Sequence, residues 1–156
     1  MSETRGPAHI YETYIRAEPE RIWTAITSAE FTRRYFHATN VASGWNVGDR
    51  VEFTYDDGTL VVEGEVQEVE KPRRLVYSWH VLYDDAMSKE RPSRVAYEIE
   101  PLGTVCRLRV THDDFDEDSL VYPQISAGWS AIICSLKSLL ETGEPLEIAG
   151  NERRAA

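Results

Sequence analysis

The sequence predicts an α+β fold, in which a curved antiparallel sheet of about six or seven strands wraps around one long C-terminal helix, with two short helices after the first strand. Three observations predict it. One strand-like segment opens the chain, a run of strand-like segments separated by turn residues fills its middle, and one long apolar helical stripe lies near its end. Strands gathered in a run and followed by a helix are typical of α+β proteins rather than of alternating α/β proteins.

The N-terminal part predicts a strand followed by two short helices. Residues 8–17 alternate between two faces with the period of two that a strand requires. Pro19 suits the first turn of a helix, and apolar residues then recur at helical spacing, which predicts a helix over residues 19–26. Ser28 is a candidate N-cap for a second short helix, because its hydroxyl can accept a hydrogen bond from an unpaired backbone N–H.

The middle of the chain predicts an antiparallel meander. Asp57-Gly58 is a strong hairpin signal, and Pro101-Leu102-Gly103 closes a later turn. Each segment places apolar residues on one face and mostly charged residues on the other, so one face of the sheet covers a core and the other meets water. The expected strands cover residues 40–42, 50–55, 60–69, 75–81, 94–100 and 105–112.

One long helix is expected to cover the apolar face of the sheet. It should begin near Tyr122-Pro123 and end at Gly143, with Pro145 just beyond, as a glycine C-cap followed by proline indicates. Gly128 inside this helix costs roughly 1 kcal/mol against alanine, and we expect a close approach of the sheet to explain it. The stripe consists of Tyr122, Ile125, Trp129, Ile132, Ile133, Leu136, Leu139 and Leu140.

Length and charge limit the organisation and the partners. The 156 residues fit one domain, residues 1–156, with flexible tails at 1–7 and 147–156. Seventeen basic residues against 27 acidic ones give a net charge of −10, which disfavours nucleic acid and anionic lipid surfaces as partners. No apolar run approaches the ~20 residues that cross a bilayer, and no signal segment opens the chain, so we expect no membrane insertion and a cytoplasmic location.

The sequence contains no pattern typical of a metal site or a cofactor site. Cys106 and Cys134 lack the paired spacing of a zinc site and are too few for a disulfide framework, so both are expected to be buried thiols. The acidic run at residues 113–118 has no glycine for the sharp turn of a calcium loop and is expected to complement the start of the long helix instead. We therefore expect no bound metal and no cofactor.

Several short phrases occur along the chain in the order of a known family. They are PERIWTAIT at residues 19–27, GWNVGD at 44–49, GEVQEV at 64–69 with PRRL at 72–75, YSW at 77–79, GW at 128–129 and LETG at 140–143. In these phrases the chain resembles the activator-of-heat-shock-protein-ATPase-like branch of the START/birch-pollen-allergen superfamily. The resemblance implies the helix-grip fold. It does not fix the chemistry, because this superfamily includes lipid carriers, hormone receptors, cyclases and co-chaperone domains.

The resemblance implies a cavity between the sheet and the long helix. Aromatic residues on the inner face and one side of the helix would line it, and the expected occupant is a small hydrophobic molecule such as a lipid, a polyketide-like compound or an isoprenoid. No catalytic residue is evident. The candidate ligand-binding residues are Trp45, Phe53, Tyr55, Trp79, Tyr97, His112, Phe115, Ile125, Trp129 and Ile133.

Two alternative functions, the role of His112 and the oligomeric state stay open. The chain could be a co-chaperone-like module that stimulates a chaperone ATPase, or a cyclase-like enzyme that uses His112 with Tyr55 and Tyr97. His112 could polarise a ligand carbonyl or act as a base, or it could simply be a buried histidine with satisfied hydrogen bonds. A homodimer is possible, because an edge strand beginning at Ala8 could pair with its copy.

Overall fold

A computed structural model describes residues 6–148 of the chain. Its elements follow the expected order of strand, two helices, meander and closing helix. They are β1 (His9–Ile15), α1 (Pro19–Thr27), α2 (Ala29–Tyr35), β2 (Asn40–Ala42), β3 (Arg50–Thr54), β4 (Leu60–Glu70), β5 (Arg74–Val81), the single-turn helix η1 (Met87–Lys89), β6 (Ser93–Leu102), β7 (Val105–Asp113) and α3 (Val121–Thr142).

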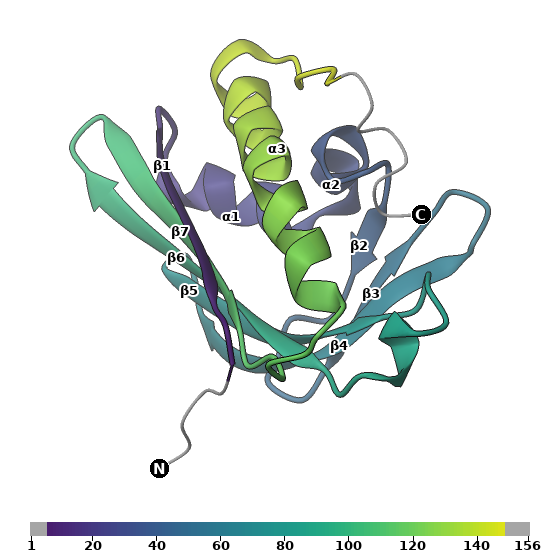
Figure 1. Ribbon diagram of the computed structural model, residues 1–156. Coiled ribbons are helices and arrows are strands. Elements are labelled where there is room, and N and C mark those ends of the chain that lie inside the picture. Colours follow the sequence, from purple (N-terminus) through teal and green to yellow (C-terminus); the bar gives the residue numbers. More distant parts are fainter. Residues whose placement is uncertain (1–5, 149–156) are drawn as a thin grey trace.

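One antiparallel sheet of seven strands forms the body of the protein, in the order β1-β7-β6-β5-β4-β3-β2. Figure 1 shows that the sheet bends around α3, which lies along its concave side. The two edge strands, β1 and β2, are joined through α1 and α2, while the remaining strands follow one another as neighbours. This arrangement is the helix-grip fold, so the predicted fold class is confirmed.

A β-bulge changes which residues of β4 face the core. The pairing of β3 with β4 shifts between Phe53 and Thr54, so that Phe53 pairs with Val62 and Thr54 with Leu60. Val61 is left between these pairs, and both Val61 and Val62 are buried. From strict alternation in the sequence, we expected Leu60 and Val62 on the inner face, with Val61 on the outer one. The bulge adds Val61, because an extra residue in one strand re-aims its neighbours.

The start of α2 lies where the sequence predicts it, but the expected cap bond is absent. Ser28 is the N-cap residue, with extended backbone angles, and its side chain makes no capping hydrogen bond. Its carbonyl oxygen instead accepts from the backbone N–H groups of Phe31 and Thr32. The prediction about the Ser28 hydroxyl is therefore wrong, and backbone bonds take its place at the start of α2.

The long helix begins with caps that the sequence analysis did not identify. Ser119 Oγ accepts from the backbone N–H of Val121 at 3.1 Å and of Tyr122 at 3.2 Å. A carboxylate oxygen of Glu90 accepts from the N–H of Leu120 at 2.7 Å. No acidic residue lies in the first turn of α3. The other end agrees with the prediction, because Gly143 has the left-handed φ of 87° that favours glycine at a C-cap.

The acidic run before α3 has a role other than the one expected. Asp114 and Asp116 both form ion pairs with Arg91, and Asp113 pairs with Arg94 at 2.9 Å. These residues connect the strand ends and the segment before β6. We expected the acidic run to interact with the start of the long helix. Glu90 and Ser119 make that interaction instead.

The edge of β1 is partly covered by side chains of α3. Lys137 Nζ donates to the carbonyl oxygen of Tyr14 at 2.7 Å, and a carboxylate oxygen of Glu141 accepts from the N–H of Arg16 at 2.8 Å. Farther along, the Tyr11 hydroxyl lies 3.2 Å from Cys134 Sγ. Because backbone groups of this edge already have partners, strand pairing between two copies at β1 would have to break these bonds.

Candidate functional site

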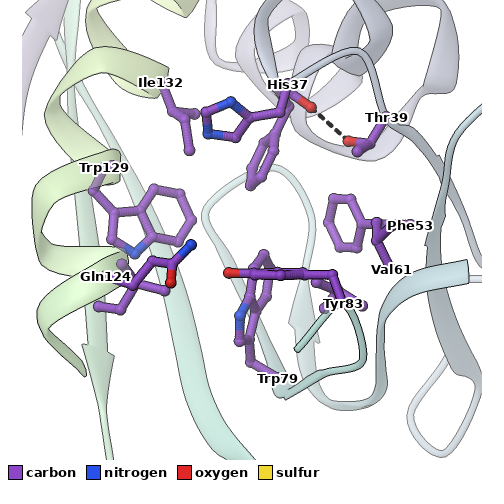
Figure 2. A pocket seen from close by; sticks show the side chains of 13 residues that line it. His37, Thr39, Phe53, Val61, Trp79, Tyr83, Gln124, Trp129 and Ile132 are labelled. Carbon is purple, nitrogen blue, oxygen red and sulfur yellow. Dashed lines mark hydrogen bonds between the residues drawn. The ribbon is translucent and has the colours of Figure 1, made fainter. Parts of the chain in front are cut away.

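A small cavity lies between the concave face of the sheet and α3. Its volume is ≈ 40 Å³, and its walls are mostly aromatic and aliphatic. Figure 2 shows the side chains of Trp129 and Ile132 on one side and those of Phe53 and Trp79 across from them. The lining residues are Phe36, His37, Thr39, Phe53, Val61, Val62, Trp79, Tyr83, Gln124, Ile125, Gly128, Trp129 and Ile132.

The size of the cavity restricts what it can hold without rearrangement. A buried water needs ~10–15 Å³ by this measure, so ≈ 40 Å³ has room for about three waters. Sites for small molecules usually measure ~300–1,000 Å³. All space between the atoms of this region, open solvent included, amounts to ≈ 520 Å³. A guest larger than a few atoms must therefore extend into the mouth or displace side chains.

Four of the sequence-predicted residues line this cavity: Phe53, Trp79, Ile125 and Trp129. The alternation of the strands and the helical spacing of α3 were enough to predict these four residues, because each lies on the inner face of a strand or helix. Phe53 and Trp79 have ring centroids 5.3 Å apart, and Trp79 and Trp129 lie 6.0 Å apart. The sheet and α3 thus contribute opposite walls of one aromatic pocket.

Among the other predicted residues, Trp45 and Tyr97 belong to the packed core rather than to the cavity wall. Trp45 donates its indole N–H to the carbonyl oxygen of Thr27 at 3.1 Å and packs beside Tyr77. The Tyr97 hydroxyl accepts from that of Tyr77 at 3.4 Å, and the Tyr97 ring packs edge-on against Trp129. These rings pack against other side chains instead of opening into the void.

The remaining predicted residues also lie outside the cavity lining. Phe115 packs against His112 with ring centroids 4.8 Å apart. Ile133 is almost completely buried in the core, and Tyr55 is partly buried near the hairpin that joins β3 and β4. The structure therefore brings the predicted residues into one continuous core but places only some of them around the void.

His112 is a buried, neutral histidine with both ring nitrogens occupied. The Trp129 indole N–H donates to His112 Nδ1 at 3.1 Å, and because an indole N–H can only donate, Nδ1 carries no proton. Nε2 then carries the proton and donates to Ser93 Oγ at 2.7 Å. Burial lowers the pKa of His112 to about 3, with a smaller contribution from nearby His9. Of the roles left open, that of a satisfied buried histidine that positions Trp129 fits this geometry best.

The turn between α2 and β2 supplies lining residues that the sequence analysis missed. Phe36, His37 and Thr39 lie there, and the backbone is left-handed at His37, with φ 52°, and at Ala38, with φ 57°. The Thr39 hydroxyl donates to the Phe36 carbonyl oxygen at 2.6 Å, the dashed line in Figure 2. No glycine or asparagine marks this turn, so nothing in the sequence pointed to it.

Two further polar side chains of the cavity lining are Tyr83 and Gln124. Tyr83 comes from the loop after β5, and Figure 2 shows its hydroxyl directed toward Gln124 of α3. Burial, with a smaller effect of Tyr55, raises the pKa of Tyr83 to about 12, so this hydroxyl is neutral at physiological pH. The loop is fastened to β5, since His80 Nε2 bonds the carbonyl oxygen of Ser88 at 2.8 Å.

Gly128 borders the cavity, and the reason we expected for it is wrong. A Cβ added there would meet nothing within 4 Å apart from the helix's own nearby backbone, although the residue is buried. The sheet does not approach this glycine closely. The missing side chain instead leaves open space beside Trp129, at the cavity wall.

Replacing Gly128 with alanine should therefore stabilise the protein by about 0.5–1 kcal/mol, because alanine is the better helix former and the added methyl group meets no obstacle. Urea unfolding followed by circular dichroism measures the change. Gly64→Ala is the opposite control, since its Cβ would lie 1.8 Å from the carbonyl oxygen of Ser78 and should destabilise strongly. A destabilised Gly128→Ala variant would show that the space beside this residue is filled.

The described part of the chain offers no other centre with evident chemistry. Within residues 6–148, no group of three or more His, Cys, Asp or Glu side chains is placed to hold a metal ion. Over the same residues, no helix is both long and apolar enough to cross a membrane. Cys106 is buried and Cys134 partly buried, and neither forms a disulfide. The apolar cavity is accordingly the candidate functional site.

Comparisons with known proteins point to one family. The family model of the Activator of Hsp90 ATPase homolog 1-like proteins matches residues 16–141. Among solved structures, protein MLL2253 from Mesorhizobium loti is 26% identical, with a TM-score of 0.74 over 86% of this chain and 97% of that one. No curated protein matches the chain at a significant level.

Two further structures share the fold at lower identity. The Aha1 dimer from Colwellia psychrerythraea is 18% identical, with a TM-score of 0.71 over 88% of this chain and 98% of that chain. PFC0360w, an HSP90 activator from Plasmodium falciparum, is 19% identical, with a TM-score of 0.69 over 86% of this chain and 94% of that chain. At these identities the likeness shows a common fold.

Proposed function

The chain belongs to the family of Activator of Hsp90 ATPase homolog 1-like proteins, and on that premise we propose that it binds a small hydrophobic molecule between its sheet and α3. The observation that carries the proposal is the apolar cavity itself, which is walled by Phe53, Trp79, Ile125 and Trp129 and is partly open to solvent. Such a void is unusual in a well-packed interior, where side chains normally leave little empty space.

The energetics allow modest affinity. A guest that buries ~300 Å² of apolar area gains about 7 kcal/mol at ~25 cal/mol per Å², before the entropic cost of association. Displacing side chains at the mouth lowers this further, because the void is only ≈ 40 Å³. We therefore expect dissociation constants between about 1 mM and about 10 μM for compounds the size of one or two rings.

Gly128→Leu provides the test, because it directs an isobutyl group into the cavity from a position with no obstructing atom within 4 Å. Small aromatic, isoprenoid and fatty compounds at ten times their dissociation constant should stabilise the wild type by about 1.4 kcal/mol, or about 3 to 6 °C in melting temperature. They should leave Gly128→Leu unchanged. Ser130→Leu, on the exposed side of α3, is the matched control and should respond like the wild type.

If no compound stabilises the wild type, or if Gly128→Leu responds as strongly as the wild type, the cavity is not the binding site. Denaturation in the absence of compounds shows in the same experiment that each variant is folded. The assay therefore separates loss of binding from loss of structure.

A second function, stimulation of a chaperone ATPase, draws support from the family and from the HSP90 activator that shares the fold. Such a role would use the outer surface. Gly128→Leu leaves that surface intact, so it should stimulate an Hsp90 ATPase as well as the wild type if the chain acts in this way. Absence of stimulation by the wild type would remove this candidate.

The cyclase-like alternative has less support from the geometry. It relied on His112, Tyr55 and Tyr97, and none of these residues lines the cavity. His112 and Tyr97 are already hydrogen-bonded within the core. Their groups would have to leave these partners before they could meet a substrate.

A further inference from the structure

One polar atom in the cavity wall has no partner. The indole nitrogen of Trp79 is buried without any hydrogen bond, and the residue is only 6% exposed. In contrast, the indole N–H of Trp129 donates to His112 and that of Trp45 to Thr27. Of the unpartnered buried side-chain atoms found in residues 6–148, the Trp79 nitrogen is the one whose residue lines the cavity; the others belong to His9, Arg91 and Ser126.

The position of Trp79 directs this N–H toward the space between the sheet and α3. The indole lies on β5 between Phe53, at 5.3 Å between ring centroids, and Trp129, at 6.0 Å. Figure 2 shows its nitrogen on the ring edge that faces Gln124 and α3. A buried donor without a protein acceptor is unfavourable unless whatever occupies the cavity, water or a guest, accepts its hydrogen bond.

The rest of the wall limits the charge that a guest can carry. No Asp, Glu, Lys or Arg side chain lines the cavity. A charged group drawn inside would lose its hydration, and apart from the imidazole of His37 no lining side chain can carry a charge that would compensate it at neutral pH. The wall therefore combines one buried donor that has no protein partner with surroundings that are mostly apolar.

We propose that the Trp79 indole N–H is the hydrogen-bond donor that anchors the guest, so that the cavity selects uncharged apolar molecules carrying a hydrogen-bond acceptor, such as aryl ketones, esters or ethers. This inference rests on the proposed ligand-binding function. A ketone oxygen satisfies the N–H, whereas a hydrocarbon of the same shape leaves it unpaired. A site with a buried polar group discriminates against the partner that cannot satisfy that group.

Acetophenone and α-methylstyrene are suitable probes, because they differ mainly in whether an oxygen or a methylene group is attached to the same carbon. The preference for acetophenone, taken as the ratio of the two dissociation constants, should be about fivefold greater in the wild type than in Trp79→Phe, as expected for one net hydrogen bond. Trp45→Phe, whose indole N–H already bonds Thr27, is the matched control and should keep the wild-type preference.

A second measurement needs no core substitution. In a ¹H–¹⁵N correlation spectrum of the wild type, assigned by triple-resonance methods, acetophenone should move the indole N–H signal of Trp79 downfield. α-Methylstyrene should perturb neighbouring signals without that downfield shift. This readout stays valid if Trp79→Phe does not fold.

The outcomes separate the two proposals. Suppose that both probes bind, that the ratio of their dissociation constants is the same in the wild type and in Trp79→Phe, and that the Trp79 signal does not move downfield. Trp79 is then not the anchor, while the proposal of ligand binding stands. If neither probe binds at concentrations up to the solubility limit, ligand binding fails and the anchor fails with it. Binding with a changed preference and a downfield shift supports both.

Discussion

Replacing Trp129 with alanine should lower the free energy of unfolding by about 3–5 kcal/mol, the range for truncating a large buried aromatic residue. Trp129 is 1% exposed, and its ring contacts those of Phe36, Trp79 and Tyr97. The substitution also leaves His112 Nδ1 without its donor. Urea unfolding monitored by circular dichroism gives the value.

Two control variants separate the causes of this loss. Trp129→Phe keeps most of the ring but loses the indole N–H, so it should cost less than the alanine variant while still leaving His112 unsatisfied. Tyr14→Ala, on a side chain that is 50% exposed, should change stability little. A loss below about 1 kcal/mol for Trp129→Ala would contradict the view that this residue is the centre of the core.

Stability should fall as the pH is lowered, with His112 as a main cause. In the unfolded chain a histidine takes up a proton near pH 6.5, whereas in the folded protein burial lowers the pKa of His112 to about 3. Between these values the unfolded state binds more protons, so acid favours unfolding. His112 alone should remove about 2 kcal/mol between about pH 7.5 and about pH 5.

The comparison of wild type with His112→Gln isolates this contribution, because other titrating groups are common to both proteins. The variant should be less stable at neutral pH, since its amide cannot reproduce both hydrogen bonds, but its stability should fall less steeply with acid. Equal slopes in the two proteins would show that folding does not lower the pKa of His112. A titration of the histidine ring signals by NMR checks the same point.

Much of the fold could be predicted because the sequence is locally consistent. The strands alternate clearly and are separated by turns such as Asp57-Gly58, so the predicted strands lie within two residues of those observed, and β2 matches residue for residue. The glycine cap and the apolar stripe likewise located α3. The cap at Ser28 was wrong because sequence identifies a suitable residue type but not whether its hydroxyl points at the helix.

The site was harder to predict than the fold. Alternation states which face of a strand a residue occupies, but not how deep it lies or whether a neighbour covers it. For this reason Tyr97 and Ile133 faced inward as expected and yet are enclosed by packing, away from the void. Val61 was missed because a bulge interrupts the period of two, and His37 because a left-handed turn without glycine gives no sequence signal.

The space beside Gly128 illustrates the same limit. The sequence shows that the helix contains Gly128, a residue that disfavours helix formation. This predicts that some feature of the tertiary structure requires a glycine there. The sequence does not show whether that feature is a close contact or an opening. In the structure the position borders the cavity, where a larger side chain would enter the space proposed for the guest.

The most direct test of the central claim is to locate a bound probe. Intermolecular nuclear Overhauser effects between α-methylstyrene and selectively labelled isoleucine methyl groups report which residues it touches. Binding in the cavity should give effects to Ile125 and Ile132, which line it from α3. Effects confined to exposed residues such as Ile10 or Ile148, with none to Ile125 or Ile132, would contradict it.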